Sequence, residues 1–324
     1  MKDNRLVFLI TELILVFVIT ILSILLVSEK SVSRSRKVTL IIENQDEDCW
    51  KGYIYGLKKA ARAKDVYLDI VSTNSIDGSE EFRELIFKAI SDGSDAIITQ
   101  PTDDSELGDI LKNAEKKVPV VLTHSNLGNG EKSSIPTVEG DNYACGKAIA
   151  REIKKDFPGG LKGKKCGLLM GHSGTEAADK AYEGFSDEIK GSGLGIKWKL
   201  NDSSLRGTSL EILKMQSEVD FVVCLSDYSL EKAARGFEER MLKCSLIYGI
   251  GNSESVCTGI DKGIIKCAVA QDEFAIGYRA MTKVIDILQG KDFSEKDEKV
   301  DYNLVRRDNL YDEENESMFY YFMQ

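Results

Sequence analysis

Polar side chains stand at the ends of several apolar, β-branched runs in this sequence. One such run ends before Gln100, and another ends before His124. Ligands of open parallel α/β sheets bind outside the carboxyl ends of the strands, so these are the positions at which chemistry is first expected. The candidate ligand-binding residues are Asp48, Trp50, His124, Ser125, Asp141, Asp179, Ser226, Asn252 and Gln271. An indole ring among amides, hydroxyls and carboxylates suits a small polyhydroxylated ligand, because the ring packs on C–H groups while polar atoms bond the hydroxyls.

Catalytic chemistry is poorly supported. The chain holds two histidines, His124 and His172, which leaves little for a triad or a metal site. The segment 171–174 is similar to part of a nucleophile elbow, but Gly174 follows Ser173 immediately and the G-x-S-x-G spacing is lost. We predict no catalytic residue, no metal and no cofactor, and we expect a protein that is not an enzyme. The seven cysteines contain no CxxC pair and are interpreted as structural thiols.

The elements that position these residues alternate between strand and helix from residue 37 onward. Strands are predicted at 38–42, 66–71, 95–98 and 118–122, with helices at 50–63, 80–91 and 105–117. The alternation of strands and helices then begins again. Helices are predicted at 142–155, 176–190, 209–217, 229–240 and 272–289, and strands at 166–170, 196–199, 220–225, 245–248 and 266–270. This order predicts two doubly wound parallel-sheet lobes of the α/β class, with a boundary in the Gly-, Ser- and Asn-rich segment 123–137.

Composition narrows the class of partner. A hydrophobic content of 42% and a charged content of 30% are typical of a folded body, and a net charge of −10 argues against nucleic acid. The basic run at 34–37 directly follows an apolar segment, where it is better placed to meet lipid headgroups. The last residues combine an acidic run with an aromatic cluster at 318–322, which we expect to pack on the second lobe or to contact a partner protein.

The N-terminal segment 6–27 is predominantly apolar and carries one charge, Glu12. At about 1.5 Å per residue it is long enough to cross a hydrocarbon core about 30 Å thick, and longer than the apolar region of a cleaved signal. We predict one uncleaved transmembrane helix that contacts membrane lipid, with residues 1–36 as anchor and basic flank. A small-x-small sequence at 31–33 keeps cleavage open as the alternative. Flanking charges taken alone favour a cytoplasmic body.

Ordered segments of the body resemble the type I periplasmic binding proteins of the ribose/galactose family, which share their fold with the cores of sugar-responsive repressors. The segments are Asp92-Gly93-Ser94-Asp95-Ala96-Ile97-Ile98-Thr99-Gln100-Pro101-Thr102-Asp103, Val118-Pro119-Val120-Val121, Gly140-Asp141-Asn142 with Cys145-Gly146-Lys147, Gly184-Phe185, Val269-Ala270-Gln271-Asp272 with Gly277-Tyr278-Arg279-Ala280, and Arg307-Asp308-Asn309-Leu310. Each is short, but their order and spacing make the joint resemblance specific.

The resemblance implies two lobes joined by a three-strand hinge and closing on a ligand. The first lobe would comprise 37–125 and 272–299, and the second 126–271 and 300–324. The implied function is an extracytoplasmic solute-binding receptor on the outer side of the cell membrane. It would close on a small polar, carbohydrate-like ligand and present it to an ABC permease or to a membrane sensor. Two alternatives stay open: a sensory module that signals to a histidine kinase without transport, and an α/β enzyme. A repressor is disfavoured because no helix-turn-helix precedes residue 37.

The expected pocket departs from the family pattern. Trp50 stands at the position of the stacking aromatic and Gln271 at that of the hinge glutamine, but both family arginines are replaced, one by Ser125 beside His124 and the other by Asp179. Ser226 stands where the family has Asn, and Gly251, next to Asn252, where it has Asp. Carboxylates are expected in the pocket instead of guanidinium groups. The bidentate hydrogen bonds that arginine donates to sugar oxygens in the family are therefore not expected here. The ligand class therefore remains open between a different sugar, a polyol and a cationic small molecule.

Overall fold

The structure, a computed structural model, describes residues 12–21, 35–43, 50–73, 76, 78–101, 106–127, 134–171, 175–205, 210–291 and 296–319. The chain divides into two compact units, Met1–Arg36 and Lys37–Gln324. In the first unit residues 12–21 are helical. Within the described part of the chain, no helix has both the length and the apolar character that a membrane crossing requires. The predicted span at 6–27 lies partly outside the described residues.

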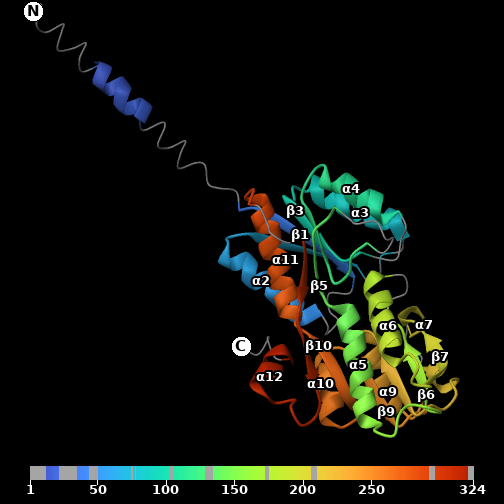
Figure 1. Cartoon of the computed structure of the whole chain (residues 1–324). Helices are drawn as coiled ribbons and strands as arrows, with labels where there is room; N and C mark the ends of the chain where they lie inside the picture. Colours follow the sequence, from blue (N-terminus) through green and yellow to red (C-terminus); the bar gives the residue numbers. More distant parts are fainter. Residues whose placement is uncertain are drawn as a thin grey trace, which may run out of the picture. The chain divides into compact units, whose positions relative to one another are not determined.

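The first sheet of the larger unit contains the described strands β1 (Lys37–Glu43), β2 (Tyr67–Thr73), β3 (Ala96–Thr99), β4 (Val120–Thr123), β5 (Thr137–Gly140) and β11 (Asp297–Val300), in the order β11-β5-β4-β3-β1-β2. All its pairings are parallel. Helices α2 (Trp50–Ala63) and α11 (Glu273–Leu288) share a core with one face, and α3 (Gly78–Ser91) and α4 (Leu107–Glu115) share a core with the other (Figure 1). Burial on both faces explains the continuous apolar run of β1.

The second sheet contains β6 (Lys165–Leu169), β7 (Gly195–Leu200), β8 (Phe221–Cys224), β9 (Leu246–Ile250), β10 (Ile265–Gln271) and β12 (Tyr302–Val305), in the order β12-β10-β9-β8-β6-β7. Only β12 runs antiparallel among these described strands. Helices α5 (Asn142–Asp156) and α6 (Glu176–Ile189) cover one face. The other face packs on α7 (Asp202–Leu205), α8 (Glu211–Lys214), α9 (Asp227–Glu238), α10 (Glu254–Asp261) and α12 (Glu313–Phe319). The two-lobed parallel α/β prediction is confirmed.

Oxygen-bearing side chains begin the long helices that follow these strands. Asp141, Thr175, Ser226, Ser253 and Asp272 each accept a hydrogen bond from the backbone N–H three residues ahead. Such a cap satisfies a donor that the first helical turn leaves unpaired. The helices therefore start close to the carboxyl ends of the strands, and their first residues face the edge of the sheet.

The described chain crosses between the sheets at three adjacent points. These are residues 140–142, 271–273 and 300–302, and they are held side by side because β11 pairs with β5 while β12 pairs with β10. The backbone N–H of Asp272 donates to the carbonyl of Asp301 at 3.3 Å. Gly140 permits this closeness, since a Cβ there would lie 2.3 Å from Nε2 of Gln271. The crossings form the three-strand connection that the resemblance implied.

Several elements differ from the sequence prediction. β5 hydrogen-bonds to β4 within the first sheet, so the chain leaves that sheet after Gly140 and not after Ser125, where the first lobe was predicted to end. The helix predicted at 209–217 is the short α8 over its described residues. The strands β11 and β12 were not predicted, because each is short and without a clear apolar alternation and exists through its pairing with β5 or β10. Phe319 of the aromatic tail is buried in the core of the second sheet.

Glycines bring one pair of helices close together in each lobe. A Cβ on Gly56 of α2 would lie 2.2 Å from the carbonyl oxygen of Phe274, and one on Gly277 of α11 would lie 2.1 Å from that of Tyr53. The pair α5 and α6 repeats this arrangement at Gly146 and Gly184, both at 2.0 Å from a facing carbonyl oxygen. The α2–α11 contact matters for the site, because the first residues of both helices, Trp50 and Glu273, reach the space between the sheets.

Candidate functional site

A cavity of about 210 Å³ lies where strand ends from both sheets meet. It brings together five of the predicted site residues, namely Trp50, His124, Ser226, Asn252 and Gln271. Its other lining residues are Gln100, Asn142, Gly171, Thr175, Ala177, Ala178, Asp202, Leu225, Asp227, Tyr228, Ile250, Gly251 and Glu273. The cavity occupies the place that the topology of parallel α/β sheets assigns to a ligand.

The side of the cavity formed by the first lobe, here called the ring side, consists of Trp50, Gln100, His124 and Glu273. The Trp50 and His124 rings meet edge to face, with centroids 5.1 Å apart. Tyr53 supports them from behind, 4.6 Å from the imidazole, and its hydroxyl donates to Oγ1 of Thr123 at 3.0 Å. Burial raises the pKa of Tyr53 above its ordinary range, so this phenol stays protonated. The ring side therefore presents a fixed aromatic surface.

His124 joins the ring side to a carboxylate. Its Nε2 lies 2.7 Å from Oε2 of Glu273, the first residue of α11, and both side chains are largely buried. The backbone of His124 has a φ of +64°, a left-handed conformation that is uncommon for any residue except glycine. Strained backbone of this kind is characteristic of sites where a side chain must be aimed in one direction.

The opposite side of the cavity, here called the acceptor side, consists of Asp202, Ser226 and Asp227 from the second lobe. The Ser226 hydroxyl accepts from the backbone N–H of Ser229 at 3.1 Å and lies 2.9 Å from Oδ2 of Asp202. The carboxyl group of Asp227 accepts from the backbone N–H of Ser253 at 3.2 and 3.3 Å. Burial, followed by the nearby charge of Glu231, raises the pKa of Asp227 well above its usual range.

Amide groups line the cavity beside the crossings. Nε2 of Gln271 donates to Oδ1 of Asn142 at 3.0 Å, and Nδ2 of Asn252 donates to the carbonyl of Gln271 at 2.9 Å. Nδ2 of Asn142 is 3.4 Å from the carbonyl of His124. Amides both donate and accept, so this row can match the hydroxyl groups of a ligand.

Three predicted site residues lie elsewhere. The hydroxyl of Ser125 is buried and accepts from the backbone N–H of Ala177 at 3.1 Å, which links the first lobe to the start of α6. Asp141 caps α5 and pairs with Lys299 at 3.2 Å. Asp179 is in the first turn of α6 and is not among the lining residues. Asp48 lies outside the described residues.

The candidate list from the sequence omitted seven lining residues with polar side chains, namely Gln100, Asn142, Thr175, Asp202, Asp227, Tyr228 and Glu273. Asn142 and Glu273 directly follow the capping residues Asp141 and Asp272, so the cap pattern was a signal that could have found them. Asp202 follows the edge strand β7 and is brought to the acceptor side by the short helix α7, for which the sequence contains no periodic signal.

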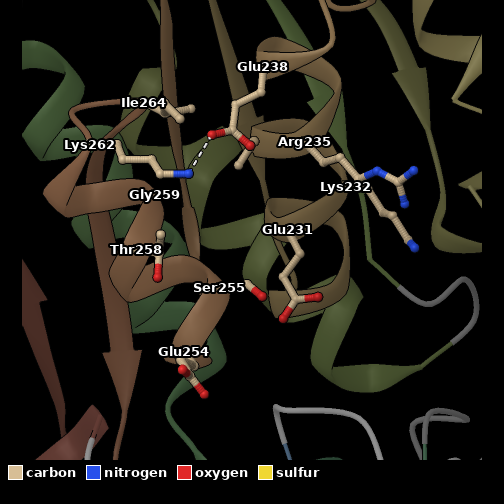
Figure 2. Close-up of a pocket in the computed structure, with 11 residues that line it drawn as sticks. Glu231, Lys232, Arg235, Glu238, Glu254, Ser255, Thr258, Gly259, Lys262 and Ile264 are labelled. Atoms are coloured by element: carbon tan, nitrogen blue, oxygen red, sulfur yellow. Dashed lines mark hydrogen bonds and ion pairs between the residues drawn. The ribbon is translucent and has the colours of Figure 1, made fainter.

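A second hollow lies on the surface between α9 and α10 (Figure 2). It has a volume of about 520 Å³ and is lined by charged residues of both signs, including Glu231, Lys232, Arg235, Glu238 and Lys262. Lys262 and Glu238 form an ion pair at 2.8 Å, both well exposed. The residues that line this hollow all belong to the second lobe. The cavity between the lobes is therefore the candidate site.

Comparison with known proteins agrees with this geometry. Residues 38–292 match the family described as periplasmic binding protein domain. The chain therefore belongs to that family of two-lobed binding proteins.

Individual relatives are more distant. The ribose import binding protein of Bacillus subtilis is 25% identical over 73% of this chain and 76% of its own length. The fructose import binding protein of Bifidobacterium longum is 29% identical, but the match spans only 32% of either chain. A carbohydrate transporter solute-binding protein of Agrobacterium radiobacter, solved with D-arabinose, superposes with a TM-score of 0.76 at 16% identity, covering 88% of this chain and 99% of that one. This last likeness concerns the fold.

Proposed function

We propose that the chain is an extracytoplasmic receptor that closes its two lobes on a small carbohydrate-like ligand and presents it to an ABC permease. The observation that carries the proposal is the cavity between the lobes, which is lined by Trp50 of the first lobe and by amide and carboxyl groups of the second. An aromatic face beside hydrogen-bonding groups from two movable bodies suits a polyhydroxylated molecule. The import proteins for ribose and fructose among the relatives support the same ligand class.

The N-terminal segment 6–27 is proposed to hold the receptor in the cell membrane as a single uncleaved helix in contact with lipid, with the body outside. Its apolar composition supports this, and the family of the body supports the orientation. Protease treatment of intact cells tests it. The body should be digested while a fragment of the anchor stays with the membrane. A body that survives until the cells are lysed would refute the orientation.

A tether also suits a second function, in which the closed receptor reports to a membrane sensor kinase instead of a permease. A receptor held by its own helix stays near one partner, whereas a released receptor can serve many. Expression of residues 37–324 as a secreted protein, without residues 1–36, distinguishes transport from signalling. Transport should survive at high receptor concentration, whereas signalling through a fixed partner should be lost.

Ligand binding is tested most directly by titration of the full-length protein with a panel of pentoses, hexoses, polyols, amino acids and polyamines. A ligand at 100 times its dissociation constant should add about 2.7 kcal/mol to the free energy of unfolding, seen as a rise in Tm. Quenching or enhancement of Trp50 emission should accompany binding in a Trp198→Phe background, since Trp198 lies in the core of the second sheet. No response to any sugar or polyol would overturn the carbohydrate proposal.

A further inference from the structure

Carboxyl groups face the cavity from both lobes. Glu273 belongs to the ring side, and Asp202 and Asp227 belong to the acceptor side. Among the described residues that line the cavity, none is lysine or arginine. Among these described lining residues His124 is the one with a basic side chain, and its Nε2 is already paired with Glu273. The oxygens of Asp227 accept from neutral donors of Ser253, its backbone N–H and its side chain.

Closure of the lobes brings carboxyl groups of both lobes together, and their repulsion opposes closure. Glu273 and Asp227 approach each other when the two sides enclose the same small volume, and the negative charge of Glu273 contributes to the raised pKa of Asp227 after burial and Glu231. A buried carboxylate without a countercharge is disfavoured by loss of hydration and by its like-charged neighbour. A neutral ligand leaves Asp227 to retain a proton. A ligand with a positive group supplies a countercharge to Asp227 and can form charge-assisted hydrogen bonds with both carboxyl groups.

The volume of the cavity and the aromatic side chains that line it indicate which class of cationic ligand fits. A volume of about 210 Å³ fits one compact molecule of monosaccharide size. The Trp50 face and the row of amides at Asn142, Asn252 and Gln271 still suit a hydroxylated ring. One ligand satisfies both sets of groups, namely a monosaccharide in which one hydroxyl is replaced by an amine.

We propose that the cavity selects an amino sugar, with its ammonium group held between Asp227 and Glu273 across the closed lobes. The inference rests on the proposed function and specifies the ligand class of the same site. The carboxyl groups supply selectivity for the ammonium, whereas the rings and amides hold the sugar.

The test compares three matched series by isothermal titration of the full-length protein: glucosamine, galactosamine and mannosamine, their neutral parent hexoses, and their N-acetyl derivatives. At least one amino sugar should bind ten times or more tightly than its neutral parent, and N-acetylation should remove that preference. In Asp227→Asn the preference should fall about tenfold while affinity for the neutral parent is retained. Glu273→Gln serves as a second variant if Asp227→Asn does not fold, as judged by circular dichroism. Glu238→Gln, on the outer part of α9, removes the same charge outside the cavity and should change nothing.

The outcomes separate the two proposals. Neutral hexoses that bind as tightly as amino sugars would overturn the amino-sugar inference and leave the carbohydrate receptor intact. Binding of a polyamine or an amino acid with no sugar bound would overturn both. An amine preference that survives in both Asp227→Asn and Glu273→Gln would also refute the inference, because the recognising groups would then lie elsewhere.

Discussion

The ring side and the acceptor side of the cavity are built from similar lobes but carry different chemistry. On the ring side, Trp50 and His124 are fixed by ring contacts with Tyr53, and the cavity receives an aromatic surface. On the acceptor side, Ser226 and Asp227 are fixed by hydrogen bonds to helix starts, and the cavity receives oxygens. The ring side therefore adds an aromatic surface to its polar residues Gln100 and Glu273, whereas the acceptor side consists of oxygen-bearing side chains alone.

The supporting helix pairs differ in a way that matters for stability. α5 and α6 follow each other in the chain, whereas α2 and α11 are joined only after the chain has visited the second lobe. The ring side therefore depends on a contact between distant parts of the sequence. Substitutions that disturb the α2–α11 contact should displace the ring-side residues. They should therefore have the largest effect on stability and on ligand binding.

Gly277→Ala is expected to have the strongest consequence. Its Cβ would lie 2.1 Å from the backbone oxygen of Tyr53, so α11 must move away from α2 and displace both Trp50 and Glu273. We expect a loss of about 3 kcal/mol in the free energy of unfolding, together with loss of ligand binding. Chemical denaturation measures the first effect and calorimetry the second.

Gly108→Ala provides the matched control for this variant. Gly108 is in helix α4, and the nearest atom to its added Cβ is Cδ1 of Leu127 at 3.9 Å. Stability should be unchanged or raised by up to about 1 kcal/mol, because alanine favours helix more than glycine does. Equal destabilisation by both substitutions would contradict the close α2–α11 contact as the cause.

Glu139 lies on β5, directly before the first crossing between the sheets. Burial, then the charge of Glu176 at the start of α6, raises the pKa of this carboxyl group from 4.5 to about 8, with Lys299 opposing and Asp297 and Asp141 adding to the rise. The folded state thus holds a proton that the unfolded chain releases near pH 4.5. Stability should therefore fall as pH rises from about 4.5 and level off above about 8.

Glu139→Gln should flatten this dependence. At pH 9 the variant should be more stable than the natural protein by on the order of 2 kcal/mol, whereas at pH 5 the two should be similar. Urea unfolding at pH 5, 7 and 9 measures the difference. Identical pH slopes for the two proteins would show that Glu139 does not titrate in this range.

Trp50→Ala tests the ring side on its own. Removing the indole should weaken binding of a sugar ligand by about tenfold to thirtyfold, which corresponds to about 1–2 kcal/mol of lost ring contact. Trp198→Phe is the control, since Trp198 packs in the core of the second sheet and donates to the carbonyl of Ser217. If the two variants bind equally well, the ring side does not contact the ligand.

Ser226→Ala is the mildest test and addresses the acceptor side. It removes the cap of α9 and the hydroxyl beside Asp202, and should lower the free energy of unfolding by about 1 kcal/mol. Ser79→Ala, whose hydroxyl donates to Glu106 at an exposed position, should have an effect below about 0.5 kcal/mol. Thermal unfolding of the two variants side by side measures the difference. A loss for Ser79→Ala as large as that for Ser226→Ala would argue against the cap.

Local sequence patterns were sufficient to predict much of this molecule. Strands with continuous apolar side chains and helices with an apolar stripe were predicted close to their bounds, because burial on one or two faces imposes a period on the sequence. Polar residues after strands located five lining residues, Trp50, His124, Ser226, Asn252 and Gln271, because chain direction places strand ends at one edge of a parallel sheet.

Only the tertiary structure decided the remaining features. β5 and β11 have too few apolar residues to be recognised alone, and they are strands because β11 hydrogen-bonds to β5 and β5 hydrogen-bonds to β4. Ser125 and Asp141 have the right chemistry and position in the chain, yet their oxygens serve α6 and α5. Asp202 and Glu273 line the cavity because two separate lobes meet. A sequence determines which groups each lobe carries, but the approach of the lobes determines which of those groups share a volume.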